Sequence, residues 1–217
     1  MIVVNFKTYP QATGVKAVDL ARICQQVMVD SGVEIMVGVQ ASDINRVAAQ
    51  VKIKVFGQHL DPLEPGRHTG FTTAFSLKQA GAAGVFLNHS EHPFTDLSSL
   101  EQAVKLAKKE SLLTLVFAKD LAAAQKIDQF SPTYIALEEP SMVSGDVAMV
   151  ELPHLRDEIK DFSQEIKSVP LLGAGIKTDK DVKQSLGLGV KGIAIASGVI
   201  KVDDPKKALL SLASAFK

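Results

Sequence analysis

The chain has 217 residues, a length that suits one compact domain with a sizeable buried core, spanning residues 1–217. Its 24 Lys and Arg balance its 24 Asp and Glu, so no basic surface is expected to bind nucleic acid or an anionic membrane. The single cysteine, Cys24, excludes an intrachain disulfide and a CxxC metal site, and no apolar run reaches the roughly 18 residues of a membrane span, so we expect a cytoplasmic protein with a small-molecule partner.

Short β-branched or apolar runs alternate along the chain with amphipathic stretches. The runs that predict strands cover residues 2–5, 34–37, 54–57, 84–87, 113–116, 134–137, 169–172 and 192–195. Helical periodicity covers residues 14–29, 97–109, 120–128, 150–167, 179–186 and 205–216. Eight strand–helix units predict a parallel sheet with right-handed crossovers that closes into a (β/α)8 barrel. An open doubly wound sheet is the alternative.

Polar side chains follow three of the predicted strands, at the end where such barrels carry their active sites. Asn5 and Lys7 end the first strand, His89 follows the fourth, and Glu138 follows the sixth. Because side chains alternate along a strand, all four are expected to point into the barrel mouth. A cation, an imidazole and a carboxylate would then converge on one place, which is typical of a functional site and not of scattered surface charges.

The same alternation predicts which strand residues face inward. The expected set is Val3 in the first strand, Val85 and Leu87 in the fourth, and Tyr134 and Ala136 in the sixth. Glu138 continues the inward row of its strand, whereas Glu139 continues the apolar row expected to meet the helices. Pro140 holds Glu139 extended and lets it turn away from the mouth. The pattern therefore favours Glu138 as the carboxylate of the site.

Glycine-containing turns follow the last two predicted strands. They are Gly173-Ala174-Gly175, which leads to a helix start at Thr178-Asp179, and Ala196-Ser197-Gly198. Glycine lets backbone amides approach an anion closely, and the loops after strands seven and eight commonly hold phosphate in such barrels. Thr178 stands where the dinucleotide fingerprint GxGxxG requires its third glycine, so the turns favour a phosphate over a dinucleotide.

These segments together resemble triosephosphate isomerase in its short archaeal-type form. The resemblance covers essentially the whole chain in the family's order, through Asn5-Phe6-Lys7, Gly57-Gln58-His59, His68-Thr69-Gly70, Asn88-His89-Ser90-Glu91, Glu138 and the two glycine turns. It implies a single-domain TIM barrel that interconverts dihydroxyacetone phosphate and glyceraldehyde 3-phosphate, a step of glycolysis and gluconeogenesis in the cytoplasm.

The resemblance also implies a role for each catalytic residue. Glu138 would be the base and His89 a neutral electrophile, a pairing of which this family is itself the standard example. Lys7 would supply a permanent positive charge beside the substrate oxygens, next to Asn5. At the start of the turn before Pro93, the imidazole would lie near amide dipoles that keep it neutral.

Further residues are implied to support the site or hold the phosphate. Glu91 would orient the lysine, with Ser90 beside it. The expected phosphate-binding residues are Val143, Ser144, Gly173, Gly175, Ala196, Ser197 and Gly198. No metal or redox cofactor is implied, and the five histidines, at positions 59, 68, 89, 92 and 154, show no HxH or HExxH spacing.

Thr69 resembles the tip of the loop that reaches into the neighbouring subunit in this family. This resemblance implies at least a homodimer, in which the site is completed across the interface between subunits. A homotetramer is equally compatible with the sequence. As a structural alternative, the same stretch would be an ordinary exposed turn.

The chain departs from the family pattern at three places. Residues 139–146 replace the usual proline and the Gly-Thr-Gly lid segment, and His92 and Phe117 stand where arginine and cysteine are common. Two other functions stay open: a non-catalytic phosphosugar-binding relative, and another phosphate-binding barrel isomerase or epimerase. A binder needs no base, and a metal-dependent epimerase needs clustered histidines and acids, so both are disfavoured.

Overall fold

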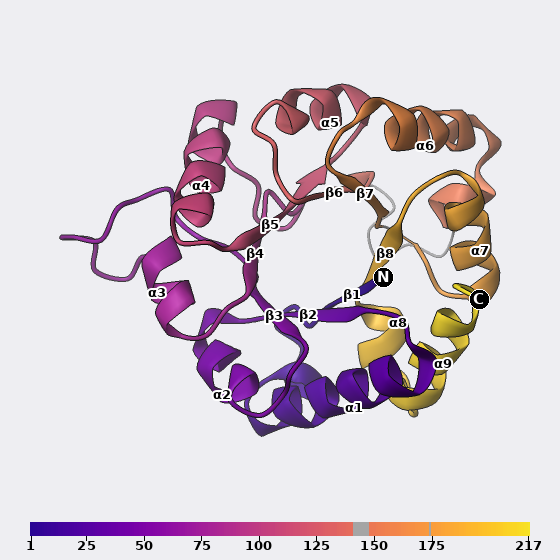
Figure 1. Ribbon diagram of the computed structural model, residues 1–217, viewed down its shortest axis with the longest axis horizontal. Coiled ribbons are helices and arrows are strands. Elements are labelled where there is room, and N and C mark those ends of the chain that lie inside the picture. Colours follow the sequence, from indigo (N-terminus) through magenta and orange to yellow (C-terminus); the bar gives the residue numbers. More distant parts are fainter. Residues whose placement is uncertain (141–147, 174) are drawn as a thin grey trace.

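The computed structural model describes residues 1–140, 148–173 and 175–217, and its strands close into a barrel surrounded by helices (Figure 1). The strands are β1 (Ile2–Asn5), β2 (Ile35–Val39), β3 (Lys54–Gly57), β4 (Gly84–Leu87), β5 (Leu113–Ala118), β6 (Tyr134–Leu137), β7 (Val169–Leu172) and β8 (Gly192–Ile195). They pair in parallel in chain order, and β8 pairs with β1. The predicted (β/α)8 barrel is confirmed, and the open-sheet alternative is wrong.

Helices follow the strands around the outside of the barrel. They are α1 (Val15–Ser31), α2 (Ile44–Ala48), α3 (Ala74–Gln79), α4 (Leu97–Lys109), α5 (Leu121–Asp128), α6 (Pro153–Glu165), α7 (Asp179–Gly187), α8 (Ser197–Ile200) and α9 (Pro205–Ser214). Short 3-10 turns are η1 (Pro10–Ala12), η2 (Ala41–Asp43) and η4 (Met149–Glu151). The helices absent from the sequence prediction, α2, α3 and α8, have four to six residues, too few to show a helical period.

Side chains with N-capping geometry fix where several helices begin. Asp96, Asp120 and Asp204 each accept a hydrogen bond from the backbone N–H three residues later, at the start of α4, α5 and α9. Thr178 does the same for α7 within a capping box completed by Asp181. These caps satisfy amide donors that the first turn of a helix leaves without partners.

Two hydrophobic layers lie on either side of the strands. The outer layer joins the strands to the helices, and the inner layer fills the barrel with Val3, Met36, Phe56, Phe86, Leu115, Phe117, Tyr134, Ala136, Leu171 and Ala194. The predicted inward direction of Val3, Tyr134 and Ala136 is therefore confirmed. Ile135 and Leu137 pack outward, as the alternation of β6 requires.

The predicted faces of β4 are wrong. Phe86 fills the barrel interior, while Val85 and Leu87 pack outward with the helices. The ring of Phe86 occupies space left by Gly38 on β2, since a methyl group built on Gly38 would overlap it. Asn88 then takes a left-handed backbone conformation, with φ 61°, which turns the chain so that His89 still lines the pocket beside Lys7.

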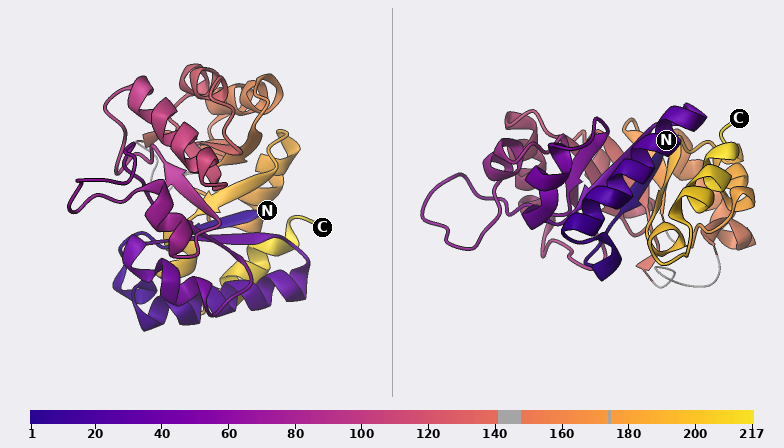
Figure 2. Two further views of the ribbon diagram at one scale, coloured as in Figure 1. Left: turned by 60° about the vertical axis from the view of Figure 1, so that its left-hand side comes forward. Right: turned by 90° about the horizontal axis from the view of Figure 1, so that it is seen from below.

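A long loop between β3 and α3 extends away from the body of the barrel (Figures 1 and 2). Its outer part is exposed, including Thr69 and Phe71. Across the described residues, none of the helices has the length and apolar character needed to cross a membrane.

Candidate active site

The end of β1 holds Lys7 in a backbone conformation that is rare for a residue with a side chain. Its φ is 47°, in the left-handed region. The Lys7 N–H donates to Asn5 Oδ1 at 3.0 Å, and the Lys7 carbonyl accepts from Gln58 Nε2 at 3.0 Å. Gln58 Nε2 also lies 3.3 Å from Asn5 Oδ1 and 3.2 Å from the carbonyl of Gly38. Hydrogen bonds on both sides of Lys7 thus maintain the strained turn.

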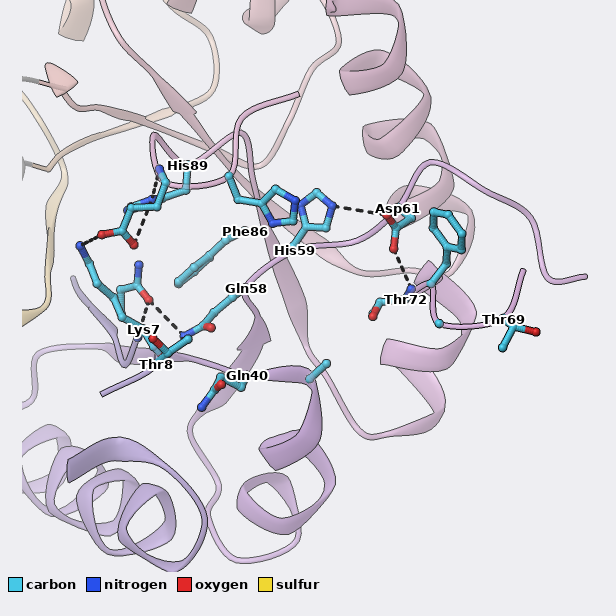
Figure 3. A pocket seen from close by; sticks show the side chains of 16 residues that line it. Lys7, Thr8, Gln40, Gln58, His59, Asp61, Thr69, Thr72, Phe86 and His89 are labelled. Atoms are coloured by element: carbon cyan, nitrogen blue, oxygen red, sulfur yellow. Dashed lines mark hydrogen bonds and ion pairs between the residues drawn. The ribbon is translucent and has the colours of Figure 1, made fainter. Parts of the chain in front are cut away.

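The ammonium of Lys7 forms an ion pair with Glu91, which lies beyond β4. The distance from Lys7 Nζ to Glu91 Oε1 is 2.6 Å. The lysine side chain is only 9% exposed, whereas the glutamate side chain is 55% exposed. The contact therefore links two strand ends that are 84 residues apart and keeps the buried end of the pair at the pocket wall (Figure 3).

His89 is 7% exposed and its tautomer follows from its contacts. The backbone N–H of Glu91 donates to His89 Nδ1 at 3.1 Å, so the neutral ring carries its proton on Nε2. The pKa of His89 is lowered to about 4. Burial is the largest cause, the Glu91 carboxylate opposes it, and the Lys7 ammonium adds to it. The imidazole is accordingly neutral near pH 7, with an N–H available at Nε2.

Glu138 brings a buried carboxylate to the other side of this imidazole. Its Oε2 lies 3.4 Å from His89 Nε2, and the residue is 8% exposed. Its backbone N–H donates to the carbonyl of Ala118 at 2.8 Å, which ties the end of β6 to β5. Glu139 is half-buried, and Pro140 is exposed. The two strand ends thus place a carboxylate and a neutral imidazole side by side.

Two pockets flank these side chains. One has a volume of about 740 Å³, and its lining includes Asn5, Lys7, His89, Glu91 and Thr69. In Figure 3, Lys7 and His89 lie toward one side of this pocket and Thr69 toward the other. The second has a volume of about 400 Å³ and is lined by Glu138, Ser90 and Phe117 among other residues. Within the described part of the chain, no group of three or more His, Cys, Asp or Glu side chains could hold a metal ion.

The glycine turns lie next to the carboxylate. Gly173 comes directly after β7 and lies close to Glu138 in space. A methyl group built on Gly173 would lie 3.0 Å from Glu138 Oε1. Gly175 has a φ of 76°, which favours glycine. Ala196 precedes α8, and Ser197 and Gly198 form its first turn. Val143 and Ser144 lie outside the described residues.

Comparison with known proteins assigns the family. Residues 1–215 match the family model described as triosephosphate isomerase. The chain belongs to the triosephosphate isomerase family. It is 34% identical over 217 residues to the triosephosphate isomerase of Methanobrevibacter smithii, covering 99% of this chain and 97% of the relative. It is 36% identical over 219 residues to that of Methanobacterium bryantii, covering 99% and 96%.

A solved structure supports the architecture. The crystal structure of triosephosphate isomerase from Bartonella henselae has a TM-score of 0.78 with 17% sequence identity, covering 99% of this chain and 98% of that one. At this identity the likeness concerns the fold, and it is the same barrel over its whole length.

The geometry gives contacts to three residues whose roles the sequence alone did not predict. Gln58 follows β3 at the same end as the other polar residues, so the strand-end rule would have found its contact with Lys7. The two departures from the family pattern also have contacts of their own. His92 stacks on His59, with ring centroids 3.9 Å apart, and Phe117 packs edge-on against His89 at 4.7 Å.

Proposed function

We propose that this member of the triosephosphate isomerase family interconverts dihydroxyacetone phosphate and D-glyceraldehyde 3-phosphate through an enediolate, without a metal or other cofactor. The observation that carries the proposal is the buried pair of His89 and Glu138, with Nε2 and Oε2 3.4 Å apart. A neutral imidazole beside a buried carboxylate suits proton transfer at carbon. The carboxylate can accept a proton from a substrate carbon while the imidazole N–H donates to the neighbouring substrate oxygen.

In the proposed reaction Glu138 removes a proton from C1 of dihydroxyacetone phosphate and returns it to C2. His89 donates its Nε2 hydrogen toward the two substrate oxygens, where negative charge develops in the enediolate. A neutral imidazole matches that intermediate better than an imidazolium, and this family is the standard example of the arrangement. The Lys7 ammonium adds a fixed positive charge, oriented by Glu91, while Asn5 holds the lysine backbone and Ser90 supports the histidine loop.

We assign the substrate phosphate to the glycine turns after β7 and β8. Backbone amides of Gly175, Ser197 and Gly198 would donate to its oxygens, with Ala196 beside them. Gly173, whose N–H donates to the carbonyl of Leu137, would leave room for the phosphate next to the turn. Gly175 has a positive φ, a backbone conformation that is strained for a residue with a side chain, which supports a glycine turn at this position. Val143 and Ser144 are proposed to complete the phosphate site from the segment that follows Pro140.

The two adjacent carboxylates provide the test. Glu138→Gln keeps shape and hydrogen bonding but removes the base, so kcat should fall by roughly 10³-fold or more, about 4 kcal/mol, with KM little changed. Glu139→Gln is the matched control and should cost about tenfold at most. Steady-state kinetics in both directions with a coupled assay measure both.

If Glu139→Gln is inactive and Glu138→Gln keeps most of its turnover, the assignment of the base is wrong. A wild-type protein that binds the triose phosphate without turnover would instead indicate a non-catalytic phosphosugar-binding relative. Turnover abolished by EDTA and restored by a divalent metal would favour the epimerase class.

We further propose that the chain acts in the cytoplasm as a homodimer or homotetramer. The loop between β3 and α3 extends from the barrel, and Phe71 and Phe75 are 56% and 45% exposed, which supports burial of this surface by a second copy. Thr69, near the loop tip, would reach the neighbouring Asn–Lys pair. Sedimentation at assay concentration tests the proposal, and a fully active monomer would contradict it.

A further inference from the structure

An aromatic column runs through the barrel interior and ends at His89. Phe56 and Phe86 have ring centroids 5.6 Å apart, Phe86 and Phe117 are 5.7 Å apart in an edge-to-face arrangement, and Phe117 and His89 are 4.7 Å apart at an interplanar angle of 75°. Edge-to-face contacts of this kind are attractive and directional. The imidazole thus forms the last ring of a packed series.

Glycines on the neighbouring strands provide the room for this column. A methyl group on Gly38 would overlap the ring of Phe86, and one on Gly84 would overlap the ring of Phe56. Both rings are therefore confined by backbone on one side and by the next ring on the other. Phe117, which packs on Phe86, has little freedom to move away from His89.

Phe117 is also tied to the histidine loop through its backbone. The Asn88 side chain donates from Nδ2 to the carbonyl of Phe117 at 2.9 Å and accepts from the N–H of Phe94 at 3.1 Å. Asn88 is the left-handed residue that turns His89 into the site. One hydrogen bond therefore joins the end of β5 to the residue that sets the direction of the imidazole.

Phe117 contacts the imidazole and is among the residues that line the second pocket. It is 3% exposed, its ring packs against His89, and the pocket that it helps to line has a volume of about 400 Å³. His89 lines the larger pocket. Because the ring is buried against the imidazole, removing it would leave a space in which water could reach His89.

From these contacts we propose that Phe117 is a positioning residue for the reaction: its ring fixes the plane of the His89 imidazole and excludes water from one face of it. The role rests on the proposed function of His89 as electrophile. The charged groups that face the same imidazole are Glu91, Lys7 and Glu138. Burial, to which Phe117 contributes, is the largest cause of the low pKa of His89.

Two substitutions separate water exclusion from orientation. Phe117→Ala removes the ring and should raise the pKa of His89 from about 4 toward its ordinary value near 6.5. About a quarter of the imidazole would then be neutral at pH 6 and nearly all at pH 8, so kcat/KM should fall about fourfold more at pH 6 than at pH 8. Phe117→Leu still excludes water but lacks the flat ring, so the pKa should stay low while kcat falls several-fold and KM changes little.

Phe162→Leu is the control, because it shortens another fully buried phenylalanine in the outer layer, away from the barrel interior. It should lower thermal stability but leave kcat and the pKa of His89 unchanged. The histidine is titrated by NMR of 15N-labelled protein, with His89→Gln identifying its signals, and kcat is measured by coupled assay.

The proposal is overturned if folded Phe117→Ala keeps the wild-type pKa of His89, or if Phe117→Leu retains the kcat of Phe162→Leu. Should Phe117→Ala fail to fold, the comparison between the two leucine variants decides. A wild-type protein without turnover would refute the proposed function, and the NMR titration would still decide whether Phe117 controls His89.

Discussion

Gly173 allows the proposed base to be displaced without changing the base itself. Its backbone is fixed, because its N–H donates to the carbonyl of Leu137 at 2.9 Å. A methyl group built on Gly173 would lie 3.0 Å from Glu138 Oε1 and 3.2 Å from Glu138 Cβ. Contacts of 3.0–3.4 Å are tighter than nine in ten real Cβ contacts, so Gly173→Ala must push the glutamate side chain aside by a few tenths of an ångström.

The size of the effect follows from that displacement. The backbone of Glu138 cannot withdraw easily, since its N–H is bonded to Ala118 at 2.8 Å, so the carboxylate has to move relative to His89. Misplacing a reacting group by about 1 Å costs on the order of 100-fold in rate. A shift of a few tenths of an ångström should therefore lower kcat roughly three- to tenfold, about 0.6 to 1.4 kcal/mol. KM should change little, because the added methyl points at the carboxylate.

The matched control is Gly187→Ala at the end of α7, where an added methyl meets nothing within 4 Å. It should leave kcat unchanged and raise stability by at most about 1 kcal/mol, the difference in helix propensity between glycine and alanine. Steady-state kinetics and thermal denaturation of both variants provide the measurement. A folded Gly173→Ala protein with wild-type kcat would refute the reasoning, and a rise in KM alone would assign the glycine to substrate binding.

Three further predictions concern the charges of the site. Glu91→Gln removes the 2.6 Å ion-pair partner of the buried Lys7 ammonium, so kcat/KM should fall about tenfold in steady-state assays; wild-type kinetics would show that Lys7 needs no orientation by Glu91. The pKa of His89 is about 4 in the folded state and about 6.5 in the unfolded state, so between pH 4 and 6.5 the unfolded chain binds a proton at this histidine that the folded chain does not. Stability from this group is thus complete above about pH 6.5 and falls by about 3 kcal/mol as the pH drops to 4; urea unfolding should show this loss in wild type and not in His89→Gln. Dialysis against EDTA should leave turnover unchanged, and loss of activity that a divalent metal restores would contradict the metal-free reaction.

Most of the barrel could be predicted because its elements carry local signals. Each buried parallel strand appears as a short apolar run, and the long helices have an amphipathic period, which in α4 and α5 begins after the capping residues Asp96 and Asp120. The segments that were missed, α2, α3 and α8, are too short for a period to develop. Their positions depend on tertiary packing, which a single sequence does not display.

The direction of the site residues was less predictable than their location. Alternation worked for β1 and β6 because the chain stays extended up to Asn5 and Glu138. In β4 it failed, since the packing of Phe86 over Gly38 fixes the opposite face inward. His89 lines the pocket because the left-handed turn at Asn88 offsets that inversion. Asparagine tolerates this conformation better than most residues, but its presence alone does not reveal it.

Left-handed residues occur at both ends of this barrel, and their role differs between the two ends. Ser111 and Ser131 also have positive φ, and their N–H groups donate to Lys108 and Asp128 just after α4 and α5. They end helices at the face where strands begin, which is a common place for such residues. Lys7 and Asn88 follow strands instead, at the face where active sites lie, and side-chain hydrogen bonds from Gln58 and to Phe117 hold them there.

No helix terminus explains the conformation of Lys7 or Asn88. A left-handed residue at the end of an extended strand changes the direction of the following chain, and in both cases the group so directed belongs to the proposed site: the lysine's own ammonium and the imidazole of His89. The strained residues therefore lie at positions where a regular strand would point the Lys7 ammonium and the His89 imidazole away from the proposed site. It follows that the barrel determines which strand ends meet, while these two turns and the side chains that hold them determine which functional groups face one another.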